Sequence, residues 1–287
     1  MNPTLYLKPG FNRAISRFRL AVYLWLMLLL LAILAIAPVN FLLRQQLGHL
    51  YLPDHPLMPL EFSLLEVFLA NQNLLAPYLS FLLVFILVSA VLFVFFSAGL
   101  FGRMLSPDPV VTFREFLADG CRHFWKFLLS LLVFLPFLVL MFLLFRLLAM
   151  PLNLWSDRAV TEWPVLIASN LRMLLLILLW TAFKLLLDLV RIIMVTESRK
   201  VIPAYASALH FLRSNFFRLW GLYLLLGVAV TLISVLWLLL ARLLSSGTPT
   251  GLVLIIILGQ AYVLFRLLAR QVFIGVEYSY YTSRKGD

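Results

Sequence analysis

The chain has 287 residues, of which 64% are hydrophobic and only 12% are charged. Soluble domains carry about 25% charged residues, so this composition excludes an ordinary water-soluble globular protein. The net charge of +11 is compatible with binding to nucleic acid, with contact to anionic lipid or with a membrane-topology signal, and the positions of the charges along the chain decide among them.

The first apolar run occupies residues 20–37 and follows four basic residues, Lys8, Arg13, Arg17 and Arg19. This arrangement is similar to a secretory signal, and residues 35–37 (Ala-Ile-Ala) are similar to a cleavage site. However, the run is longer than the apolar core of about 7–15 residues that signals have, and Pro38 would follow the cut. We therefore expect a retained first transmembrane helix.

Five further apolar runs follow, each close to the roughly 20 residues that a helix needs to cross a bilayer. The runs are continuous and rich in Leu rather than alternating, which favours helices over strands. The sequence predicts an all-α polytopic membrane protein, a single membrane domain spanning 1–287. Its six transmembrane helices are expected at about 20–43, 74–101, 127–148, 164–187, 219–241 and 251–268.

Basic residues are distributed unevenly between the two sides of these spans. Of the 23 Lys and Arg residues, 18 lie before span one, near the 2–3 and 4–5 connections or after the middle of span six, and 5 lie on the other side. Lys and Arg are enriched on the cytoplasmic side of membrane proteins. We predict a multi-pass protein of the cytoplasmic (inner) membrane with both termini in the cytoplasm. Its basic side would face anionic lipid, and no nucleic-acid partner is expected.

Three aromatic-basic-apolar triplets open the odd-numbered spans: Phe18-Arg19-Leu20, Trp125-Lys126-Phe127 and Phe217-Arg218-Leu219. A proline and an amphipathic stretch precede each triplet. This pattern predicts three helix-pair units, each preceded by an interfacial amphipathic helix, the second and third at about 111–124 and 203–216. An alternative stays open, in which aromatic-basic pairs mark a membrane edge without any repeat.

Each amphipathic stretch has an apolar stripe that we expect to face the acyl chains. The three stripes consist of Phe11, Ile15 and Phe18; of Phe113, Phe116, Leu117, Gly120 and Phe124; and of Tyr205, Leu209, Leu212 and Phe216.

The third stretch also carries a resemblance to a known family. Ala204-Tyr205-Ala206-Ser207-Ala208, followed by Phe211-Leu212-Arg213-Ser214-Asn215-Phe216-Phe217-Arg218-Leu219, resembles the entry segment of a bacterial six-helix membrane family. That family includes the membrane domain of glycerophosphoryl diester phosphodiesterases. The resemblance covers about 20 residues, and elsewhere it rests on the number and layout of the spans. It implies a helical membrane domain of unassigned function, and it supplies no catalytic residue.

The densest polar feature within a span is the set Lys184, Asp188 and Arg191 in span four. Spacings of four and three residues place all three on one helical face, where Asp188 can pair with both cations. Such a cluster can fix the depth of the helix at the cytoplasmic edge, or it can form a pathway or lipid-headgroup site. Gln260 in span six is expected to bond a neighbouring helix.

Other candidate residues are weaker. Gly221, Gly227, Thr231 and Ser234 in span five suggest close approach of a neighbouring helix. The loop at 44–73 contains His49, Asp54 and His55, but its spacing fits no known metal site, and we expect a solvated loop. The sequence predicts no catalytic, cofactor-binding or metal-binding residue.

The function favoured by these features is that of a non-enzymatic membrane scaffold or subunit, which binds or regulates a protein partner or a second copy of the chain. The alternative is a transporter or lipid-handling protein with a site between helices. An enzyme is not expected, because the spans contain no carboxylate pair, no Ser/His set and no metal-ligand group. A polar cavity lined by Lys184, Asp188 or Gln260 would favour transport, and a filled core would favour a scaffold.

Overall fold

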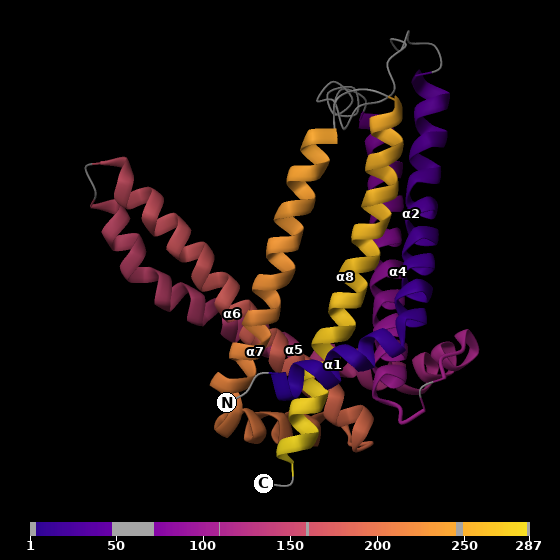
Figure 1. The fold of residues 1–287 in the computed structure, drawn as a ribbon. Coiled ribbons are helices and arrows are strands. Elements are labelled where there is room, and N and C mark those ends of the chain that lie inside the picture. The colour runs from indigo at the N-terminus through magenta and orange to yellow at the C-terminus, as the bar shows by residue number, and fades with distance from the viewer. Residues whose placement is uncertain (1–3, 48–71, 109, 159–160, 245–248, 286–287) are drawn as a thin grey trace.

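The computed structural model describes residues 4–47, 72–108, 110–158, 161–244 and 249–285, and every regular element among them is an α-helix (Figure 1). The helices are α1 (Thr4–Ser16), α2 (Phe18–Leu47), α4 (Gln72–Leu105), α5 (Phe113–Asp157), α6 (Glu162–Thr196), α7 (Val201–Leu244) and α8 (Pro249–Arg284).

All six predicted spans are confirmed as helical segments. Six helices are long and apolar enough to cross a membrane, and each predicted span lies within one of them. Leu-rich runs without a polar face bury well in lipid only when their backbone groups bond internally, as they do in a helix. The protein is therefore an all-α multi-pass membrane protein.

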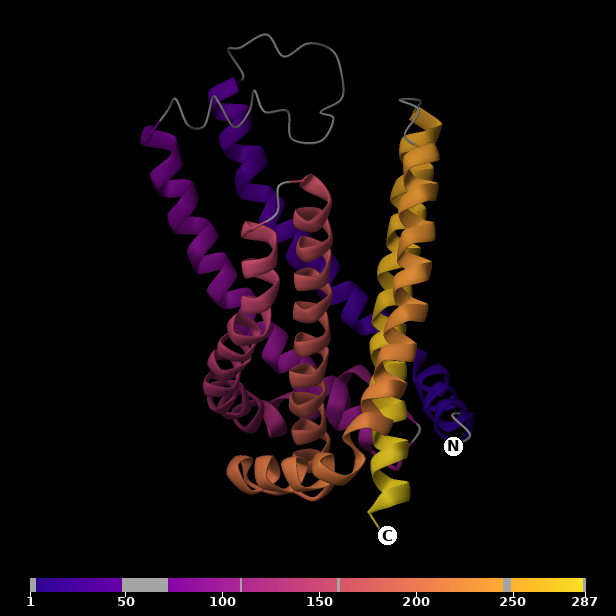
Figure 2. The same ribbon diagram turned by 90° about the vertical axis from the view of Figure 1, so that its left-hand side faces the viewer.

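The packed core lies at one end of the molecule, where α1 and the C-terminal end of α8 also lie (Figures 1 and 2). It is formed where α4, α6 and α8 contact one another, by buried residues within 94–105, 185–194 and 269–281. Toward the other end the helices spread and expose large apolar side chains such as Leu83, Leu143 and Leu238. An all-round apolar surface of this kind suits contact with acyl chains.

Helix α1 crosses the C-terminal part of α8 at close range (Figure 1). Two glycines make this approach possible: a Cβ atom added at Gly10 would lie 2.6 Å from the backbone nitrogen of Val276, and one added at Gly275 would lie 2.6 Å from the carbonyl oxygen of Gly10. Any larger residue at either position would force the two helices apart.

The predicted amphipathic segment at 111–124 is helical from Phe113 and the one at 203–216 is helical throughout, and they form the first parts of the continuous helices α5 and α7. A capping box begins α5, in which Thr112 and Glu115 satisfy each other's backbone N–H groups. Figure 2 shows the first part of α7 lying across the lower end of the bundle before the helix turns upward into its span.

The three triplets share one pattern of burial. Their aromatic residues Phe18, Trp125 and Phe217 are exposed, whereas their last residues are buried in the core: Leu20, Phe127 and Leu219. The same alternation between surface and core recurs at the three entries, and the three-unit repeat stays a prediction.

The apolar stripes differ from the prediction. Phe11 and Ile15 of the first stripe are exposed, as a lipid-facing stripe would be. In the second and third, Phe116, Tyr205 and Leu212 are buried within the protein. The expectation that these stripes face acyl chains is wrong for those residues, because Phe116 packs against Phe96 and Gly99 of α4 and Tyr205 packs against Ser130 and Phe137 of α5.

Candidate functional site: buried charges and a polar pocket at the packed end

Asp188 of α6 and Arg270 of α8 form a bidentate ion pair in the packed core. Two guanidinium nitrogens of Arg270 donate to the two carboxylate oxygens of Asp188 at 2.5 and 2.6 Å. The Asp188 side chain is 1% exposed, and that of Arg270 is 24% exposed. Paired, parallel hydrogen bonds between charged groups are among the strongest that proteins make, so this pair fixes α6 against α8.

The predicted pairing within span four is therefore corrected. In the described part of the chain, no ion pair joins Asp188 to Lys184 or to Arg191. Arg191 is buried instead beside aromatic rings, with its guanidinium carbon 5.2 Å from the ring centre of Phe127, and it donates to the Ser97 hydroxyl at 3.4 Å. A planar guanidinium reaching across from α8 matches the carboxylate better than side chains on the same helix can.

Gln260 lies apart from this cluster. Its side-chain oxygen accepts a hydrogen bond from the indole N–H of Trp25 at 2.8 Å, which joins α8 to α2. Ten residues along a helix separate Gln260 from Arg270, a rise of about 15 Å. The contact is the interhelical bond expected of a lone glutamine in an apolar span.

Two buried polar residues of α8 were not singled out from the sequence. Gln271 and Glu277 are 0% and 2% exposed, and neither side chain has a hydrogen-bond partner among the described residues. Span six was predicted to end near 268, before both residues. The seven-residue spacing of Arg270 and Glu277, which places them on one helical face, was the available signal.

A second group of buried cations joins the first two helices to the end of α4. The Arg17 guanidinium donates to the carbonyl oxygens of Met104, Ser106 and Asp108 at 3.0, 2.7 and 3.1 Å. Burial lowers the pKa of Arg17, and the nearby cations Arg13 and Arg103 act in the same direction. Arginine nevertheless stays protonated in proteins. The Arg17 cation therefore interacts favourably with carbonyl groups that have no partner within the helix at the C-terminal end of α4.

Arg103, at the end of α4, pairs with the carboxylates of Asp108, Glu115 and Asp119 at 3.4, 3.2 and 3.6 Å. These contacts join the α4–α5 connection to the first two turns of α5. Arg17 and Arg103 thus hold the α4–α5 connection in place through buried hydrogen bonds and ion pairs.

A polar pocket of about 720 Å³ opens beside the start of α7. It is lined by Glu197, Arg199, Ala206, Ser207, His210, Phe211, Ser214, Asn215, Tyr281, Arg284 and Lys285. The carboxylate of Glu197 pairs with Arg199 at 2.6 Å and with Lys285 at 2.7 Å, and it accepts a hydrogen bond from the Tyr281 hydroxyl. Burial raises the pKa of Glu197, but the hydrogen bonds from Lys285 and Tyr281 and the neighbouring cations outweigh it and hold this pKa below its ordinary value.

The weaker candidate residues, those of span five and of the loop at 44–73, do not form a ligand-binding arrangement in the described part of the chain. A Cβ atom added at Gly221 or Gly227 would meet nothing within 4 Å, so the expected close helix approach at these residues is wrong. Ser234, of the same predicted set, does contact α8, by accepting a hydrogen bond from Tyr262 at 2.8 Å. Residues 48–71 of the predicted solvated loop lie outside the described residues. Within those that are described, no three His, Cys, Asp or Glu side chains form a metal-binding group.

Comparison with known proteins gives no further guide: no family model, no curated protein and no solved structure matches the chain. The chemistry of the buried cluster and of the pocket is therefore derived from their residues alone.

Proposed function

We propose that the chain is a non-enzymatic membrane scaffold or subunit that binds or regulates a protein partner. The closed, ion-paired core carries this proposal. Asp188 and Arg191 are buried within it, and none of the four pockets described in the molecule is lined by Lys184, Asp188 or Gln260. These are the residues around which a transport route was expected, and Asp188 instead joins two helices.

The proposal includes a location in the cytoplasmic (inner) membrane, with both termini in the cytoplasm and anionic lipid at the packed end. The bias of 18 to 5 in Lys and Arg supports this orientation. The exposed aromatic residues Phe18, Trp125 and Phe217, each followed by a basic residue, suit the headgroup layer. Membership of the family that residues 204–219 resemble is part of the same proposal.

A transporter or lipid-handling protein is the second candidate, and one observation favours it. Glu277 and Gln271 are buried polar residues without partners in the described part of the chain, close to the packed end of α8. Unsatisfied polar groups at such positions are costly, and they occur where a ligand, an ion or a moving segment uses them.

Site-specific photo-cross-linking in cells tests the scaffold function. A photoreactive phenylalanine analogue would replace Trp125 or Phe217 at the packed end, and Trp163, an exposed residue at the start of α6, would serve as the control. We expect one protein adduct of defined mass at both packed-end positions and none at Trp163. Adducts to lipid alone at all three positions, combined with solute uptake by reconstituted vesicles that is lost in Glu277→Gln, would favour the transporter instead.

A further inference from the structure

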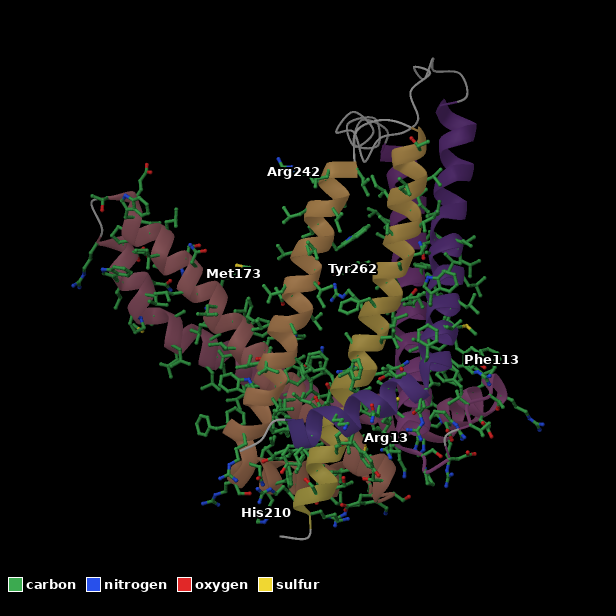
Figure 3. The ribbon with its side chains drawn as sticks, in the orientation of Figure 1. Arg13, Phe113, Met173, His210, Arg242 and Tyr262 are labelled. Carbon is green, nitrogen blue, oxygen red and sulfur yellow. The ribbon has the colours of Figure 1, made fainter. Side chains whose placement is uncertain are left out.

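The pocket beside the start of α7 has the size and position of a ligand site. It is formed by three separate segments, the α6–α7 connection, the first part of α7 and the last turns of α8. Its volume of about 720 Å³ lies within the range of about 300–1,000 Å³ that small-molecule sites occupy. Figure 3 shows His210, one of its lining residues, at the same end of the molecule as the C-terminal part of α8.

The charges of the pocket favour an anion. Among the described lining residues, Arg199 and Lys285 share one carboxylate, that of Glu197. Because Glu197 is already engaged by Arg199, Lys285 and Tyr281, it does not present a free carboxylate to a ligand. Arg199 and Lys285 together carry one more unit of charge than the carboxylate between them.

The polar side chains around these cations can also bind an anion. The guanidinium of Arg199 also donates a hydrogen bond of 2.5 Å to the Ser207 hydroxyl. His210 and Ser214, one turn apart on α7, line the same pocket. Guanidinium and ammonium groups surrounded by hydroxyls form a typical binding site for phosphate oxygens.

We infer that this pocket binds a phosphate-bearing anion, with Arg199 and Lys285 as its main charged contacts. Apolar residues of the same helix, Ile202 and Leu209, are exposed next to it. Both an anionic lipid headgroup at the membrane surface and a water-soluble phosphate ester carry the required group. The inference does not depend on the scaffold function, because the pocket is separate from the cross-linking positions at Trp125 and Phe217.

The test measures binding to the full chain in neutral detergent by native mass spectrometry, supported by thermal unfolding. One arm uses dioleoyl phosphatidic acid with dioleoyl phosphatidylcholine as its uncharged counterpart, and the other uses inorganic phosphate against chloride at equal ionic strength. The site variant is Arg199→Gln with Lys285→Gln. The matched control is Arg19→Gln with Arg213→Gln, which removes the same charge from exposed residues that do not line the pocket.

We expect the site variant to weaken binding of phosphatidic acid or of phosphate about tenfold or more, which corresponds to a loss of about 1.4 kcal/mol, and the control to change it by less than about twofold. If the site variant loses binding in the lipid arm alone, the ligand is a lipid headgroup. If it loses binding in the phosphate arm, the ligand is a soluble phosphate ester. Equal losses in both variants, or no loss in either arm, would overturn the inference.

A further variant separates a binding site from a purely structural one. Glu197→Gln removes the one carboxylate among the described residues of the pocket lining. If the pocket binds a phosphate, this change raises the local positive charge and should strengthen binding in the arm that responds, by a few-fold. Weaker or unchanged binding in that arm would contradict the site, whereas the unfolding temperature is expected to fall in either case because the ion pairs of Glu197 are lost.

Discussion

The buried ion pair of Asp188 and Arg270 lies where three helices meet. At the scale of single residues, it makes a large contribution to the stability of the packed end. Removing charges from water costs several kcal/mol for each ion, and this cost is offset only when geometry and hydrogen bonding are favourable. The bidentate contact meets that condition. An unpaired member of the pair would be strongly unfavourable, whereas an apolar pair of similar volume would be tolerated.

We predict that Asp188→Leu and Arg270→Met each lower the free energy of unfolding by about 3–5 kcal/mol, because each leaves one buried charge without its partner. The double variant should come within about 1 kcal/mol of the wild type. Unfolding in detergent of the four proteins measures this coupling. Rescue of Asp188→Leu by Lys184→Met, rather than by Arg270→Met, would instead support the pairing within span four that the sequence suggested.

The second prediction concerns the pH dependence due to Glu197. Its pKa is held below the ordinary value of 4.5, so the folded state binds this proton less readily than the unfolded state does. The stabilisation is therefore fully present above pH 4.5 and is lost as pH falls through the lower, folded-state pKa. Glu197→Gln should lower the unfolding temperature at pH 7, and this difference from the wild type should shrink in acid. Lys285→Met should show a smaller loss with the same pH trend, and a difference that grows in acid would disprove the assignment.

At the scale of elements, the crossing of α1 and α8 depends on the absence of two side chains. We predict that Gly275→Ala lowers the free energy of unfolding by about 1–3 kcal/mol, because its Cβ atom would overlap the backbone of Gly10. Gly221→Ala is the matched control: its Cβ atom meets nothing, and the better helix propensity of Ala should stabilise the protein by up to about 1 kcal/mol.

Thiol labelling shows whether α1 moves away from α8 in the Gly275 variant. Ala14 is buried on α1, so Ala14→Cys in a Cys121→Ser background should react slowly with a water-soluble maleimide. The reaction should become faster when Gly275→Ala is added. Equal labelling rates in the two backgrounds would show that the helices remain in contact despite the added methyl group.

The sequence predicted the helices well and their contacts poorly, and the residues show why. Continuous apolar runs specify a helix in a bilayer whatever surrounds them, so all six spans could be placed. Contacts between helices depend on which faces meet, and no local pattern encodes this. Arg270 therefore could not be assigned to Asp188 from spacing, and Gly10 and Gly275 gave no signal, whereas Gly221 gave a misleading one.

At the scale of the whole molecule, the three amphipathic segments pack in a related manner. The start of α5 lies against α4, where Gly99 and Gly102 face Phe116 and Asp119, and α7 packs on α6. Helix α1 packs on α8. The first and last elements thereby complete a cyclic arrangement, with α4, α6 and α8 in contact at its centre. Figures 1 and 2 show all of these contacts at one end of the bundle.

This arrangement places both ends of the described chain on one side, and the charge bias predicts that this side is cytoplasmic. Alkaline phosphatase, which is active only after export, should be inactive when fused to the N-terminus or to the C-terminus. It should be active when inserted after Arg242, which Figure 3 shows at the opposite end from His210. A cytoplasmic fluorescent reporter should give the reverse pattern. Phosphatase activity at either terminus, with the fusion protein intact in the membrane, would reverse the orientation and would move the pocket and its phosphate ligand to the outer surface.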